Sequence, residues 1–398
     1  MSHDDSQDHK SPFTIDRRQV LGLLGSASAL ALLGANPVRA GQGARDEEKD
    51  DDDRGEEVSL DTRLVRDYGI RYPIVSAGMA FVGLPELAVA VSNAGGLGVY
   101  GAAPEPPPVV DARLSAIASQ TVNPFGVDFI LASGPLGDFT TQDHIDIAAG
   151  HRVPVVVFHF NLPPQAWVDQ LQAAGSRVWV QAGSADVAEQ AGRLGCDAVI
   201  AQGKSAGGHN HNQTIPTLAL VAQIRSRLPE RCLLLAAGGI ADGRSLLRAL
   251  RAGADGGWIG TRFAASAESY AHPGYKARLV SAKGRHATKF TTAFGPEFPN
   301  ATQRVLANRA ATEPPSTQPP GIGSTLLFPG VFNVPYEMPK YSAIVPTRDT
   351  TGDLEQMDMP AGSESVLEVV RVQPAAEIIA EIVTEARQLL EVGGRDDG

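Results

Sequence analysis

Short apolar runs alternate with longer amphipathic stretches between residues 73 and 263, and this alternation constrains the fold of the chain more than any other feature. Eight apolar runs occur, at 73–77, 97–100, 126–131, 153–158, 177–181, 197–201, 232–236 and 255–259. Helix-like stretches follow them at 84–94, 109–119, 143–149, 164–174, 185–194, 215–228, 243–252 and near Ala264. The runs are rich in Val, Ile, Leu and Ala without polar alternation, as parallel strands covered on both faces are. The sequence therefore predicts a closed (β/α)8 TIM barrel, with a doubly wound sheet as the alternative.

The segments outside this region have different compositions. Residues 1–40 contain a twin-arginine pattern at Arg17-Arg18, an apolar run at 20–33 and a cleavage-site pattern at Val38-Arg39-Ala40. They predict a signal peptide read by the twin-arginine export machinery, a periplasmic or otherwise exported protein, and no stable membrane anchor after cleavage. An N-terminal membrane anchor is the alternative.

Three further regions complete the predicted organisation. Residues 41–60 are mostly charged and predict a disordered acidic linker. The barrel is expected over residues 61–280. The C-terminal extension, residues 281–398, begins with a Pro- and Gly-rich wrapping segment at 311–340 and ends with helical periodicity at 365–392. The helical part is expected to pack back on the barrel.

Charge and cysteine content exclude several classes of function. The net charge of -11 argues against nucleic acid or an anionic membrane as partner. The two cysteines, Cys196 and Cys232, are too few for a disulfide framework or a cysteine-rich metal site, and their apolar surroundings predict buried thiols. His209 and His211 have no carboxylate or cysteine nearby in sequence, so a metal site is not expected.

The loop from Gln202 to His209 has the composition of a functional site. It follows a predicted strand and contains Gly207-Gly208, which allow a flat ligand to approach the backbone closely. His209 has the side chain best suited to proton transfer near neutral pH. In a barrel, such a loop lies at the C-terminal ends of the strands, where functional groups gather. His159 ends the fourth predicted strand and is a candidate for the substrate pocket.

The last two predicted strands end in Gly238-Gly239 and Gly260-Thr261. Loops at these positions of a barrel frequently bind phosphate through backbone N–H groups. A phosphate there and a flat ring over Gly207-Gly208 together indicate one elongated ligand. FMN has that shape, whereas a nicotinamide nucleotide fits less well because no strand–GxGxxG–helix unit is present.

Five motifs, in the same order and spacing, resemble the nitronate monooxygenase family, formerly called 2-nitropropane dioxygenase. They are Pro73-Ile-Val-Ser-Ala-Gly-Met79-Ala, Val91-Ser-Asn-Ala-Gly-Gly-Leu-Gly98, Gln202-Gly…Ala206-Gly-Gly-His209, Ala236-Ala-Gly-Gly-Ile-Ala-Asp-Gly243 and Gly260-Thr-Arg-Phe263. The resemblance covers about residues 62–280. It implies an FMN-dependent barrel enzyme that oxidises alkyl nitronates with O2 to a carbonyl compound and nitrite.

The resemblance also implies roles for individual residues. His209 matches the catalytic histidine. The cofactor-binding positions are Met79, Asp128, Gln181, Gln202, Gly207, Gly208, Gly238, Gly239, Gly260 and Thr261, of which the last four would hold the phosphate. The segment Ala361-Gly362-Ser363 resembles a family stretch that borders the flavin. Asp128 stands where the family usually has Asn, and Ser205, in the expected substrate pocket, stands where it usually has Glu.

Two alternative functions stay open. The first is an FMN-dependent NAD(P)H reductase of the enoyl-reductase type, a related class that shares the barrel and the Gly-Gly-His loop. The second is an exported protein that binds FMN or another phosphate ligand without turnover. An oligomer is possible in each case.

Overall fold

The computed structural model describes residues 58–134, 137–284, 286–295, 301–313 and 319–396. The predicted signal peptide, residues 1–40, and residues 41–57 of the predicted acidic linker lie outside the described residues, so both stay predictions. Over the described ranges, no helix has both the length and the apolar character needed to cross a membrane.

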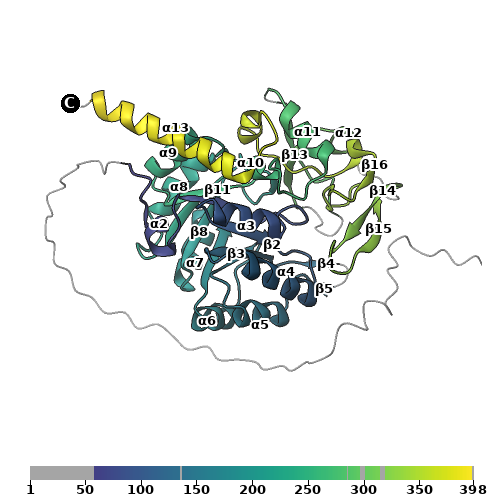
Figure 1. The fold of residues 1–398 in the computed structure, drawn as a ribbon, viewed down its shortest axis with the longest axis horizontal. Helices are drawn as coiled ribbons and strands as arrows, with labels where there is room; N and C mark the ends of the chain where they lie inside the picture. Colours follow the sequence, from purple (N-terminus) through teal and green to yellow (C-terminus); the bar gives the residue numbers. More distant parts are fainter. Residues whose placement is uncertain (1–57, 135–136, 285, 296–300, 314–318, 397–398) are drawn as a thin grey trace, which may run out of the picture. The chain divides into compact units, whose positions relative to one another are not determined.

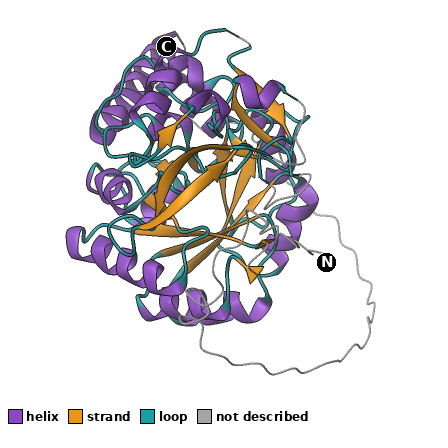
Figure 2. Cartoon of the chain, turned by 90° about the vertical axis from the view of Figure 1, so that its right-hand side faces the viewer, coloured by secondary structure: helices purple, strands orange, loops and turns teal. Residues whose placement is uncertain are grey.

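Eight parallel strands form the centre of the fold and helices surround them (Figure 2). In chain order they are β1 Ile74–Ser76, β2 Gly98–Gly101, β3 Phe125–Ile130, β6 Val155–His159, β7 Arg177–Ala182, β8 Ala198–Gln202, β10 Leu233–Ala237 and β11 Gly256–Ile259. β11 pairs with β1, and a parallel bridge from Val75 to Leu97 joins β1 to the start of β2. The sheet therefore closes, which confirms the predicted barrel and makes the doubly wound alternative wrong.

Seven helices alternate with these strands. They are α3 Pro85–Asn93, α4 Pro107–Gln120, α5 Gln142–Gly150, α6 Gln165–Ala173, α7 Ala185–Arg193, α8 Thr217–Arg225 and α9 Gly243–Arg251. Local sequence sets several of their beginnings. Proline occupies the first turn of α3 and α4, where no backbone N–H is needed, and Asp242 caps α9 by accepting from the backbone N–H of Ser245 at 2.7 Å.

Both faces of the strands are buried, which explains their continuous apolar character. In β8, Ala198 and Ile200 point into the barrel, while Val199 and Ala201 pack under the surrounding helices. Trp179 and Trp258 fill the barrel interior with ring centroids 6.4 Å apart. The thiols of Cys196 and Cys232 are buried, as predicted, and burial raises the pKa of each to about 12.

The helix that occupies the eighth position comes from the C-terminal end of the chain. β11 is directly followed by the one-turn helix α10, Thr261–Ala264, whereas the long helix α13, Ala375–Asp396, packs against α9, α3 and α10 (Figure 1). Its apolar face is buried through Ile378, Ile379, Ile382, Val383 and Ala386. A Cβ at Gly243, where α9 begins, would lie 2.3 Å from the backbone nitrogen of Ala386, so glycine is required for this contact.

The chain between α10 and α13 forms a second layer beside the barrel. It contains α11 Pro273–Ser281, β12 Thr288–Thr291, β13 Gln303–Leu306, α12 Arg309–Thr312, β14 Gly321–Leu327, β15 Val334–Pro339, β16 Thr351–Gly352 and 3-10 turns at Leu354–Gln356 and Ser365–Glu368. The Pro- and Gly-rich segment, expected to be extended, includes the antiparallel β14–β15 pair. β13 pairs with β12 and with the short strand β9, Gly208–His209, in the loop after β8. A small hairpin, β4 Ser133–Gly134 with β5 Gly137–Asp138, follows β3.

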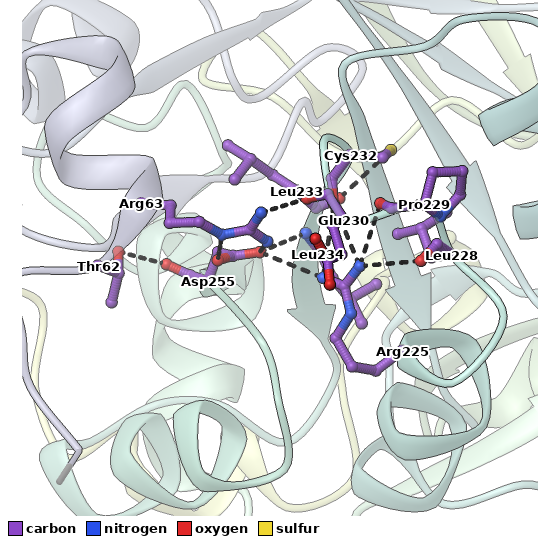
Figure 3. Close-up of polar contacts among 10 residues, drawn as sticks. All are labelled: Thr62, Arg63, Arg225, Leu228, Pro229, Glu230, Cys232, Leu233, Leu234 and Asp255. Carbon is purple, nitrogen blue, oxygen red and sulfur yellow. Dashed lines mark hydrogen bonds and ion pairs between the residues drawn. The ribbon is translucent and has the colours of Figure 1, made fainter. Parts of the chain in front are cut away.

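The short helix α2, Arg63–Tyr68, is joined to the N-terminal ends of the last two strands by the polar network in Figure 3. Asp255 accepts from Arg63 Nε at 2.9 Å and Nη2 at 2.8 Å, and from the backbone N–H of Leu234 at 2.8 Å. Tyr68 then packs edge-on against Trp179 and accepts from its indole N–H at 2.7 Å. This end of the barrel is therefore filled, and the opposite end remains for a ligand.

Candidate active site

A cavity of about 200 Å³ opens at the C-terminal ends of the barrel strands. Its wall includes twelve of the residues singled out in the sequence: Met79, Asp128, His159, Gln181, Gln202, Gly207, Gly208, His209, Gly238, Gly239, Gly260 and Thr261. Ser205 is buried but does not line the cavity. Residues from seven strands and the loops that follow them thus meet at one place, because the strands of a parallel barrel all end on the same side.

Glycines shape one wall of the cavity, and their backbone geometry requires that residue type. Gly238 and Gly239 have φ of 108° and 76°, and Gly208 has φ of 75°. Residues with a Cβ rarely adopt these backbone conformations. A Cβ at Gly238 would lie 2.6 Å from the backbone nitrogen of Ala206, and one at Gly207 would lie 2.6 Å from the carbonyl carbon of Ala361. The result is a side-chain-free surface that a ligand can approach through backbone groups.

The segment Ala361–Glu364 lies against this glycine wall. The backbone N–H of Gly362 donates to Thr261 Oγ1 at 2.9 Å, and that of Ser363 donates to the carbonyl of Ser205 at 3.0 Å. The carboxylate of Glu364 stands next to Gly239, since a Cβ there would be 2.9 Å from its Oε2. The C-terminal part of the chain therefore borders the two loops predicted to hold a phosphate.

Asp128 places a carboxyl group in the wall with no counter-charge. Its side chain is 7% exposed, its Oδ1 has no hydrogen-bond partner, and a Cβ at Gly78 would lie 2.4 Å from its Oδ2. No Lys or Arg is among the described residues that line the cavity. Burial raises the pKa of Asp128 well above its usual value. Asp128 therefore keeps its proton to a higher pH than an exposed aspartate does, and in its protonated form it has one O–H donor and one acceptor, like the amide of an asparagine.

Two glutamines hold the strand ends and the histidine loop. Gln202 donates through Nε2 to the backbone carbonyl of His209 at 2.9 Å, while its buried Oε1 has no hydrogen-bond partner. Gln181 Nε2 lies 2.6 Å from Nδ1 of His159. Gln202 thus fixes the backbone at the candidate catalytic residue and leaves an acceptor for a ligand.

Three histidines gather around Phe160. Its ring centroid is 4.4 Å from that of His159, 5.4 Å from His209 and 4.9 Å from His211. Burial, then the nearby His211, lowers the pKa of His209 to about 4. Burial and the other two imidazoles lower the pKa of His159 well below its usual value, and partial burial lowers that of His211. At neutral pH the three imidazoles are therefore uncharged and able to accept a proton or a hydrogen bond.

Several cavity residues were not identified in the sequence. Phe160 directly follows His159, and its φ of 76° is uncommon for a residue with a Cβ, so its position depends on the surrounding fold. Tyr275, Gln303 and Asp358 come from the second layer and belong to no recognised motif. Tyr275 donates its hydroxyl to the carbonyl of Pro360. Of these residues, only Phe160 could have been predicted from the sequence, because it stands at the end of a predicted strand beside the candidate residue His159.

Comparison with known proteins identifies the family. A family model for nitronate monooxygenase matches residues 61–385. The chain belongs to the nitronate monooxygenase family. A probable nitronate monooxygenase of Staphylococcus aureus strain Newman is 28% identical over 369 residues, which cover 83% of this chain and 98% of that protein.

Two solved structures place the chain among oxidoreductases. FabK from Thermotoga maritima superposes with a TM-score of 0.67 at 30% identity, covering 84% of this chain and 98% of that one. The nitroalkane oxidase from Streptomyces ansochromogenes superposes with a TM-score of 0.66 at 27% identity, covering 83% and 99%. This member of the nitronate monooxygenase family is therefore an oxidoreductase enzyme.

The two residues that differ from the usual family pattern, Asp128 and Ser205, lie in different places in the fold. Asp128 faces the cavity, whereas Ser205 lies outside the cavity lining and packs against the segment Ala361–Glu364. Arg304 donates to the carbonyl of Lys204 at 3.1 Å, which ties the start of the histidine loop to β13. Within the described part of the chain, no group of three or more His, Cys, Asp or Glu side chains is arranged to hold a metal ion.

Proposed function

We propose that this protein binds FMN in the cavity and uses it to oxidise alkyl nitronates, with O2 as the final oxidant, to a carbonyl compound and nitrite. One observation carries the proposal: a side-chain-free wall formed by Gly238, Gly239 and Gly260 shares a single cavity with His209. Membership in the nitronate monooxygenase family and the similarity to a nitroalkane oxidase support this substrate class.

The residues present fit FMN on two counts. The glycine wall would admit a phosphate to backbone N–H groups and to the Thr261 hydroxyl, as loops at these barrel positions commonly do. Gln202 Oε1 and Asp128 Oδ1 are buried without hydrogen-bond partners, and buried polar atoms generally have one. A flavin ring carries donors and acceptors that would satisfy both. When bound, FMN supplies an electron acceptor.

The chain's own residues would bind and orient the substrate and handle its protons. His209 is uncharged at neutral pH and stands at the cavity wall, so its imidazole can take the α-proton of a neutral nitroalkane and form the nitronate inside the cavity. Gln202 holds the backbone of His209 in place. Phe160 and Met79 contribute apolar surface that limits access of water to the cavity.

The experiment that tests this proposal begins with the purified protein's absorbance spectrum and identification of the released flavin as FMN. Ethyl nitronate and, separately, neutral nitroethane are then supplied in air, and nitrite and acetaldehyde are measured. His209→Ala is expected to keep its FMN while turnover of nitroethane, which must first lose its α-proton, falls by about 10²–10⁴-fold, the usual effect of removing a general acid or base. His151→Ala, a histidine paired with Asp111 away from the cavity, is the control. Near-full activity of His209→Ala on nitroethane would refute the role given to His209.

A reductase that takes electrons from NAD(P)H is the second candidate, because the similarity to FabK is as close as that to the nitroalkane oxidase. Anaerobic stopped-flow mixing distinguishes the two. Rapid bleaching of the flavin by NADH, with no response to ethyl nitronate, would replace the first proposal by the second. A protein that binds FMN and responds to neither would be a binding protein without turnover.

The proposal places this enzyme outside the cytoplasm, on the pattern around Arg17-Arg18 alone. Cell fractionation of a strain that produces the full chain tests it, since a protein found only in the cytoplasm would contradict export.

A further inference from the structure

Gln303 lines the cavity, and its side-chain amide takes part in none of the interactions described above. Its side chain is 0% exposed, and neither its Nε2 nor its Oε1 has a hydrogen-bond partner within the protein. It lines the cavity and belongs to β13, in the second layer. Burying an amide with all its hydrogen bonds unmade is unfavourable, so such a group in a binding cavity points to a ligand.

Strand pairing places Gln303 next to His209. β13 pairs antiparallel with β9, and in this register Gln303 stands directly opposite His209. The pairing continues through the backbone N–H of Asn210, which donates to the carbonyl of Thr302 at 3.0 Å. Directly opposed residues of an antiparallel pair project their side chains to the same face. The amide of Gln303 and the imidazole of His209 therefore face the same part of the cavity, and both line it.

The other cavity amides are already engaged. Gln202 Nε2 donates to the carbonyl of His209, and Gln181 Nε2 contacts the ring of His159. The described cavity wall contains no Lys or Arg, so an anionic oxygen placed there depends on neutral N–H donors. A glutamine amide offers two such donors and one acceptor.

We propose that Gln303 is a substrate-recognition residue, whose side-chain amide N–H donates to an oxygen of the substrate held beside His209. A substrate with two oxygens on one nitrogen would present one of them to Gln303 and leave the neighbouring carbon to His209. The identity of that substrate rests on the proposed function, whereas the donor role of Gln303 applies to any small anion with oxygen atoms in this part of the cavity.

Two variants and one control test the inference on the FMN-loaded enzyme. Gln303→Met keeps a similar length without hydrogen-bonding groups, and Gln303→Glu adds a negative charge in nearly the same shape. Gln190→Met changes an exposed glutamine of α7. For ethyl nitronate, KM of Gln303→Met is expected to rise about 10–100-fold, the range for losing a hydrogen bond to a charged group, with a larger rise in Gln303→Glu. The flavin spectrum and the control should be unchanged.

A second measurement uses nitrite as a non-reacting probe. Nitrite is titrated into wild-type and variant enzyme, and its Kd is read from the change in flavin absorbance. The same 10–100-fold weakening is expected in Gln303→Met. A wild-type enzyme that binds nitrite but does not turn over ethyl nitronate would refute the proposed function, while the nitrite comparison would still decide on Gln303. Equal KM and equal nitrite Kd in wild type and Gln303→Met, or a Gln303→Met protein that no longer retains FMN, would overturn the inference.

Discussion

Replacing Asp128 by Asn should stabilise the flavin-free protein, and increasingly so as the pH rises. Asp128 is 7% exposed, has an unpartnered Oδ1 and faces no positively charged side chain in the described cavity wall. Its pKa in the folded protein is raised well above the usual value by burial. In the unfolded chain, an aspartate loses its proton above about pH 4.

The sign and size follow from proton linkage. Above about pH 4 the unfolded chain has released the Asp128 proton while the folded protein still holds it, so unfolding releases one proton and stability falls as pH rises. One proton corresponds to about 1.4 kcal/mol for each pH unit. The free energy of unfolding of Asp128→Asn should therefore exceed that of wild type by a margin that grows by about 1.4 kcal/mol per pH unit, until the folded-state pKa is reached.

Urea titrations of both proteins without added flavin, from about pH 5 to pH 8, measure this difference. Asp67→Asn, which removes one exposed carboxylate of α2, controls for the change in net charge. A difference in the free energy of unfolding between wild type and Asp128→Asn that does not change with pH would refute the conclusion that Asp128 keeps its proton in the folded protein.

Two further predictions concern the barrel ends. Asp255→Ala should lower the free energy of unfolding, measured by urea titration, by about 2–4 kcal/mol, because Arg63 loses its carboxylate partner and the buried N–H of Leu234 loses its acceptor. Asp61→Ala, which removes an exposed pair with Arg66, should lower it by less than about 1 kcal/mol. Gly238→Ala should weaken FMN binding at least about 10-fold in a fluorescence titration, because its Cβ would lie 2.6 Å from the backbone nitrogen of Ala206. The control is Gly175→Ala, which should bind FMN normally: Gly175 has a similar φ of 95°, but its Cβ would meet no atom within 4 Å. Normal FMN affinity in Gly238→Ala would contradict the glycine wall.

The eight strands and seven of the helices were predictable because each is encoded by its own local pattern. A run such as 197–201 is apolar on both faces wherever it lies in the fold, and its length and the glycines that follow mark its end. The site loops were predictable for the same reason. Gly238-Gly239 directly follows β10, and Gly207-Gly208-His209 lies in the loop after β8. A parallel barrel brings all strand ends to one side.

The sequence by itself thus determined the barrel, the position of its active face and most of the residues that line the cavity. Tertiary structure decided what depends on partners distant in the chain. α13 completes the ring of helices from beyond residue 374, Gln303 reaches His209 only through the β9–β13 pairing, and Asp128 has a raised pKa because the folded protein buries its carboxyl group. Local patterns specify which element forms, whereas pairing register and the charges around a buried group are set only when distant segments meet.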